Sequence, residues 1–70
     1  MKLNVELEPG WRIVELRHNP GQFLCTIVIS NTAGKTWEAG YDLQKGIFIT
    51  TLPITIDASL IRNILRSIMQ

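Results

Sequence analysis

Hydrophobic and polar residues alternate along most of the chain, and the period changes near its end. Between residues 2 and 8, Leu3, Val5 and Leu7 alternate with polar residues, which is the period-two pattern of a half-buried strand. The same pattern, or a close variant of it, recurs over residues 11–17, 23–30, 35–42 and 46–52. The chain is therefore expected to form four or five β-strands.

Glycine and proline mark the boundaries between these segments. Pro9-Gly10 and Pro20-Gly21 suit the central positions of a type II turn, because proline presets φ and glycine accepts a positive φ. The stretches 31–34 and 44–46 give two further turn signals. Turns spaced by about 11 or 12 residues favour an antiparallel meander.

Two of the segments depart from simple alternation. In the second segment the apolar parity changes between Ile13 and Val14, which predicts a β-bulge or burial on both faces. The third segment, 23–30, is largely apolar on both faces, as is typical of a central strand that is covered on both sides.

The last part of the chain has the period of an amphipathic helix, predicted over residues 58–69. Pro53 ends regular strand pairing before it, and Asp57 is placed to cap its first turn. One continuous apolar stripe contains Leu60, Ile61, Ile64, Leu65, Ile68 and Met69. On the other side, we interpret Arg62 and Arg66 as solvated residues near the negative end of the helix.

These elements predict an α+β fold within a single domain, residues 1–70: an antiparallel meander of four to five β-strands followed by one C-terminal α-helix packed on the sheet. One helix covers one face of a sheet. We therefore expect a second copy to cover the other face, with the apolar stripe of the helix as the candidate interface. The alternative is a strongly curled, barrel-like sheet that encloses its own apolar residues.

Composition favours the homodimer. Only 19% of the 70 residues are charged, whereas 46% are hydrophobic, and a chain of this length buries a modest core. One cysteine and one histidine exclude an internal disulfide and a zinc site within one chain. The net charge of +1 lacks the basic excess of a polyanion binder. No run is long enough for a membrane span and no signal peptide is recognisable, so a cytoplasmic location is expected.

Few residues could carry chemistry. His18 precedes a turn with no partner near it in sequence, and Cys25 lies among large apolar residues. Gly34-Lys35-Thr36 lacks the earlier glycine of a phosphate loop. We therefore predict no enzymatic activity, no catalytic residue, no metal ligand and no cofactor.

Aromatic residues with cations near them in sequence form the candidate binding surface: Trp11, Arg12, Arg17, Lys35, Trp37 and Tyr41. Such a surface would anchor a protein interface or stack on single-stranded nucleic acid.

The strands-then-helix order resembles the single-stranded-DNA-binding domain of the transcriptional positive-cofactor and Whirly group. The similarity includes Lys45-Gly46-Ile47 before the last strand and the hairpin from Arg17 to Gly21-Gln22. It implies dimerisation through the helix and single-stranded nucleic acid as a partner. That group is richer in Lys and Arg on its strands, whereas this chain carries acidic residues there.

The leading functional prediction is a small non-catalytic interaction module, homodimeric, that presents a surface to a protein partner. The first alternative is a dimeric single-stranded nucleic-acid-binding protein that uses the aromatic surface. The second is a small enzyme or ligand-binding subunit whose site is completed across an oligomer.

Overall fold

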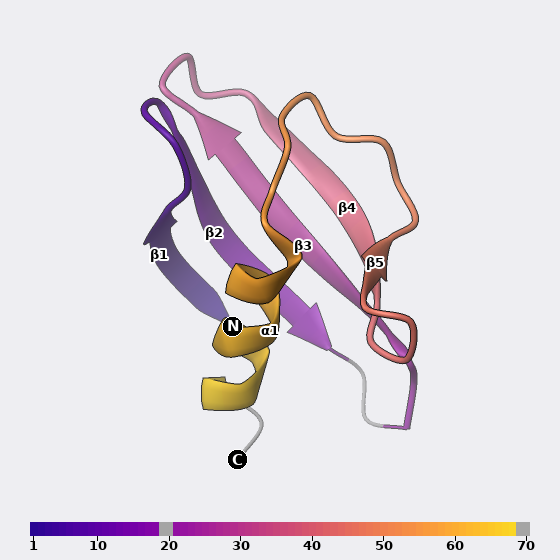
Figure 1. Cartoon of the computed structure of the whole chain (residues 1–70). Coiled ribbons are helices and arrows are strands. Elements are labelled where there is room, and N and C mark those ends of the chain that lie inside the picture. The colour runs from indigo at the N-terminus through magenta and orange to yellow at the C-terminus, as the bar shows by residue number, and fades with distance from the viewer. Residues whose placement is uncertain (19–20, 69–70) are drawn as a thin grey trace.

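Five antiparallel strands followed by one helix confirm the predicted α+β architecture (Figure 1). The structure is a computed structural model that describes residues 1–18 and 21–68. The strands follow one another across the sheet in chain order, so that β1 and β5 are its two edges. The elements are β1 (Lys2–Glu6), β2 (Trp11–His18), β3 (Leu24–Asn31), β4 (Thr36–Asp42), β5 (Ile47–Phe48) and α1 (Ala58–Ile68).

The turns that join these strands lie where glycine was expected to place them. Gly10 has a φ of 88°, and the turn that contains it is closed by a 2.9 Å hydrogen bond from the Trp11 N–H to the Glu8 carbonyl. At the β3–β4 turn the side-chain oxygen of Asn31 accepts from the N–H groups of Ala33 and Lys35. Of the second predicted turn, Pro20 lies outside the described residues.

The predicted bulge in β2 is present. Ile13 pairs with Ile29 and Glu15 pairs with Val28, so the register shifts by one residue between them and Val14 is the extra residue. This shift brings Ile13 and Leu16 onto the same face of the sheet, where both are buried. A second register shift lies between β1 and β2. Because bulges increase the local twist, they account for the upward curl of this side of the sheet.

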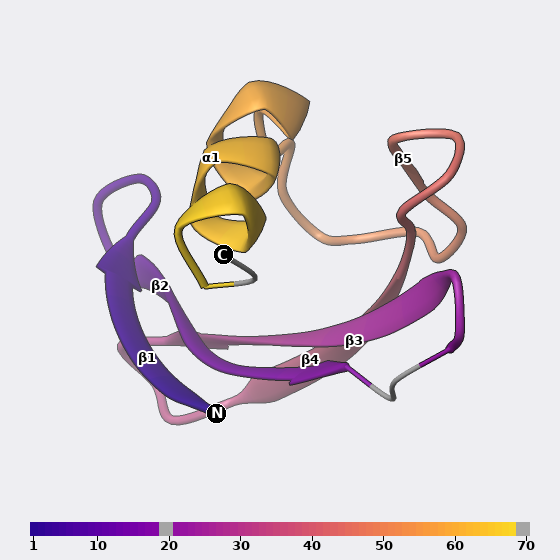
Figure 2. The same ribbon diagram turned by 90° about the horizontal axis from the view of Figure 1, so that it is seen from below.

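The sheet curls into a trough, with β1 and β5 at its raised edges and α1 lying over the concave side (Figure 2). The buried cluster in this trough contains Ile13, Leu16, Cys25, Ile27, Ile29, Tyr41, Ile61 and Leu65. The helix contributes Ile61 and Leu65, which are 1% and 6% exposed. The chain therefore fills the concave face of the sheet with its own helix.

The convex face of β3 is less apolar than alternation suggested. Val28 is buried there, but its partners on the neighbouring strands are Glu15 and Glu38. Arg17 donates hydrogen bonds to both glutamates, at 2.8 and 2.9 Å. Lys2 lies 4.0 Å from Glu15. Charged side chains from three strands thus surround Val28 on this face.

The fifth strand is shorter than the predicted 46–52. Ladder pairing covers only Ile47–Phe48, although the Ile49 N–H still donates to the Gly40 carbonyl at 2.9 Å. The chain then leaves the sheet edge to reach the helix on the concave side (Figure 1). Along this connection every second residue is half-buried against the core: Leu52, Ile54 and Ile56. Alternation therefore continues in a segment that is not a strand.

Asp57 caps α1 as predicted. Its carboxylate accepts from the Ser59 N–H at 2.9 Å and from the Ser59 hydroxyl at 2.8 Å. The helix is described as far as Ile68, so Met69 lies outside the described residues. Within the described part of the chain, no helix has both the length and the apolar character needed to cross a membrane.

Shortening Leu65 should destabilise the protein strongly, because its side chain fills the trough. We expect Leu65→Ala to lower the free energy of unfolding by about 2–5 kcal/mol. The exposed neighbour Arg66 is the control, and Arg66→Ala should stay within about 0.5 kcal/mol of the wild type. Urea unfolding followed by circular dichroism measures both, and equal midpoints for the two variants would show that the helix face is misassigned.

Acid should weaken the fold through Glu15. Its pKa is lowered from the ordinary value of 4.5, chiefly by the Arg17 hydrogen bonds. A carboxylate with a depressed folded pKa stabilises the protein above its unfolded pKa, and this contribution is lost as the pH falls through the folded pKa. We expect the free energy of unfolding to decline below pH 4.5, and Glu15→Gln to flatten that decline.

Urea melts at several pH values measure this effect. The matched control is Glu8→Gln, which removes the same charge from an exposed residue outside the ion-pair network. If Glu15→Gln and Glu8→Gln show the same pH slope, the network does not stabilise the fold.

Candidate functional site

The structure divides the predicted aromatic and cationic surface between the two faces of the sheet. Trp11 and Trp37 pack against the core on the concave side, with ring centroids 4.9 Å apart. Tyr41 is 2% exposed and meets Phe48 edge to face at 5.1 Å. The three predicted aromatic residues therefore all lie on the concave face, where they pack in or against the hydrophobic core.

The predicted cations lie elsewhere. Arg17 is engaged by glutamates on the convex face. Arg12 donates to the side-chain oxygen of Asn4, and Lys35 lies in the β3–β4 turn. The six predicted residues are thus not brought onto one surface.

Part of the predicted apolar stripe of the helix packs against the sheet of the same chain. Ile61 and Leu65 are buried under the helix, whereas Leu60 and Ile64 are half-buried on its flanks. An opening of about 340 Å³ lies between α1 and β1, lined by Leu3, Val5, Asn63, Ile64 and Ser67. Of the remaining stripe residues, Met69 and the side chain of Ile68 are outside the described part.

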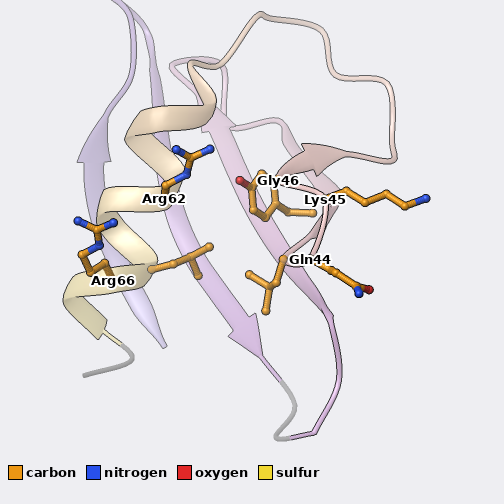
Figure 3. Close-up of a pocket in the computed structure, with 8 residues that line it drawn as sticks. Gln44, Lys45, Gly46, Arg62 and Arg66 are labelled. Atoms are coloured by element: carbon orange, nitrogen blue, oxygen red, sulfur yellow. The ribbon is translucent and has the colours of Figure 1, made fainter.

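A larger pocket lies on the other flank of α1, between the helix and the β4–β5 turn (Figure 3). Its volume is about 420 Å³, within the range of small-molecule sites. The lining consists of Tyr41, Leu43, Gln44, Lys45, Gly46, Arg62, Leu65 and Arg66.

The wall of this pocket formed by the β4–β5 turn is held by Asp42. One carboxylate oxygen of Asp42 accepts from the N–H groups of Gln44 and Lys45, at 2.9 and 3.0 Å. The Asp42 carbonyl accepts from the Gly46 N–H at 2.8 Å. Gly46 has a φ of 71°, a conformation that favours glycine. These hydrogen bonds fix the conformation of the turn, which forms the pocket wall opposite the helix side chains.

Two hydrogen-bond donors meet beside Gly46. A Cβ atom added to Gly46 would lie 3.7 Å from Nη2 of Arg62 and 3.7 Å from the Tyr41 hydroxyl oxygen. Figure 3 shows Arg62 reaching from the helix toward Gly46. Glycine at this position leaves the space between the two donors open to the pocket.

His18 and Cys25 are cross-strand partners on the concave side, a pairing that their separation in sequence does not reveal. The ring of His18 bonds the Gln22 carbonyl at 3.2 Å. Burial raises the pKa of the Cys25 thiol, which keeps the thiol protonated. Among the described residues, no group of three or more His, Cys, Asp or Glu side chains could hold a metal ion.

Exposed apolar residues gather on the convex face beside β5. Leu24 and Ile47 flank Asp42 in the strand register, and Ile49 packs over Gly40 in the next row. Leu24, Ile47 and Ile49 are 46%, 52% and 57% exposed, and together they form what we term the β5-edge patch.

The two edges of the sheet differ in charge. At the β1 edge the strand carries Lys2 and Glu6. At the β5 edge the stretch 46–56 contains no charged residue. Charged side chains discourage an edge strand from pairing with another chain, and the β5 edge lacks this charge protection.

Comparison of the chain with protein-family models, with curated proteins and with solved structures finds no match in any of the three. The pocket and the β5-edge patch, with the chemistry of their residues, are therefore the features that bear on function.

Proposed function

We propose that the chain is a small non-catalytic interaction module that binds an extended protein segment at the β5 edge. In the purified protein, β5 of one copy would pair with β5 of a second copy, and the module would form a homodimer. The observation that carries the proposal is the β5-edge patch, which places exposed apolar side chains beside an uncharged edge strand.

Strand pairing and side-chain burial would act together at this edge. An edge strand presents unpaired backbone N–H and C=O groups, which a partner strand satisfies. A partner with apolar residues at every second position would bury Ile47 and Ile49 at the same time, since both have the same parity along the chain. Backbone bonds would supply affinity, and the patch would supply preference for apolar partners.

A protein partner suits this surface better than nucleic acid does. Phosphate recognition relies on lysine and arginine side chains, and the patch contains none. On the same convex face Arg17 is occupied by two glutamates. The aromatic residues that would stack on bases pack against the core instead.

Cys25 supports the non-catalytic part of the proposal. It is 3% exposed and burial raises its pKa, so it is poorly suited to act as a nucleophile. A free thiol also fits the reducing conditions of the cytoplasm, which is the location that we propose.

A charge placed on the β5 edge should separate the dimer. Ile47 is exposed, so Ile47→Lys leaves the core intact while placing an ammonium group where two strands would meet. We expect the dissociation constant of the dimer to rise by about tenfold or more. Light scattering after size exclusion, over a range of protein concentrations, measures the mass of each variant.

The matched control is Thr36→Lys, which adds the same charge to an exposed residue at the far end of β4. It should remain as dimeric as the wild type. A wild type that stays monomeric at high micromolar concentration, or an Ile47→Lys protein that dimerises like Thr36→Lys, contradicts pairing through the β5 edge.

A further inference from the structure

The positive charges of the chain are unevenly partnered. Arg17 and Lys2 lie in ion pairs on the convex face. Lys45, Arg62 and Arg66 line the pocket beside α1, and among the described residues none of the three has a carboxylate within ion-pair distance. Of the residues that the structure describes, no acidic one lines that pocket. Although the net charge of the chain is only +1, the electrostatic potential at this pocket is therefore positive.

Arg62 is the cation in this pocket for which α1 provides neither a favourable helix dipole nor an acidic partner. Arg66 lies in the last turn of α1, where a positive charge is favoured by the helix dipole. Arg62 lies earlier, and the described helix contains no acidic residue to pair with it along the helix. Its guanidinium instead lies beside Gly46, across the pocket from its own helix.

The Tyr41 hydroxyl faces the same point. Its ring is buried, yet the hydroxyl makes no hydrogen bond with any described residue, and none joins it to Arg62. The oxygen is not among the buried polar atoms that lack a partner, so it reaches the pocket surface. Arg62 Nη2 and the Tyr41 hydroxyl are thus two donors that border the same space beside Gly46.

The acid nearest in sequence does not compete for these donors. Asp42 is absent from the lining of the pocket, and its carboxylate is held by the N–H groups of the turn. Leu43 and Leu65 add an apolar surface to the lining. The pocket thus combines a polar, positive end with an apolar wall.

We infer that this pocket binds a small organic oxyanion, a carboxylate or phosphate attached to an apolar body. Arg62 and Tyr41 donate to the oxyanion, with Arg66 adding positive charge, and the apolar body lies against Leu43 and Leu65. Guanidinium groups suit this task because their fork of N–H groups matches carboxylate and phosphate oxygens. The site lies on the concave side of the sheet, whereas the β5-edge patch lies on the convex side.

The test is a titration of the labelled full chain followed by NMR, with four probes. Phenyl phosphate and benzoate carry both parts of the ligand, with different oxyanions. Inorganic phosphate carries only the charge and phenol only the apolar body. We expect phenyl phosphate or benzoate to bind at least about tenfold more tightly than the two partial probes. The amide shifts should centre on residues 43–46 and 62–66.

Two variants assign the donors. Arg62→Gln should weaken binding of the better probe by about tenfold, and Tyr41→Phe by about threefold, since each removes a hydrogen bond and the first also removes a charge. Lys35→Gln is the control, because it removes one exposed positive charge at the β3–β4 turn. Its affinity should equal that of the wild type.

Three results would overturn the inference. One is the absence of binding by either complete probe at millimolar concentration. Another is shifts that centre outside the pocket, on the β5-edge patch for example. The third is equal affinity of Arg62→Gln and Lys35→Gln, which would show that general charge rather than the Arg62 geometry holds the anion.

Discussion

The fold depends on the packing of one helix into the concave side of one curled sheet. Ile61 and Leu65 of α1 share a buried cluster with Ile27 and Ile29 of the central strand β3. Burying these side chains is the main favourable contribution to folding available to a chain of 70 residues with a single cysteine. The bulge at Val14 serves the same packing, since it turns two apolar residues of β2 inward and curls the sheet around the helix.

This packing determines where binding surfaces remain. The concave face is occupied by α1, and the middle of the convex face carries the ion pairs of Arg17. A single helix does not span the whole trough, so openings flank it on both sides, toward β1 and toward the β4–β5 turn. The β5 edge is the other accessible feature, because the chain leaves the sheet there to reach the helix. The proposed protein interface and the proposed anion site both follow from this geometry.

Local sequence patterns predicted the strands and the helix. The position of the pocket depends instead on how the helix packs on the sheet. The strands and the helix were predicted from the alternation of apolar residues, the turn glycines and the Asp57 cap. The bulge was predicted from the change of apolar parity at Val14. Alternation also overextended the fifth strand, since a half-buried connection has the same period as a strand. The pocket was not predictable, because Tyr41 and Arg62 meet only once the helix lies in the trough. The uncharged stretch 46–56 was the one visible signal for the β5 edge.

The measurement that tests this account most directly is native-state hydrogen exchange, followed amide by amide. If α1 and β3 form one cooperative core, their slowest amides should exchange with the same free energy, equal to that of global unfolding. Amides of β5 should exchange through smaller local openings, because its ladder covers only two residues. Helix amides that exchange far faster than those of β3 would show that α1 detaches from a sheet that is stable without it, which would contradict the account.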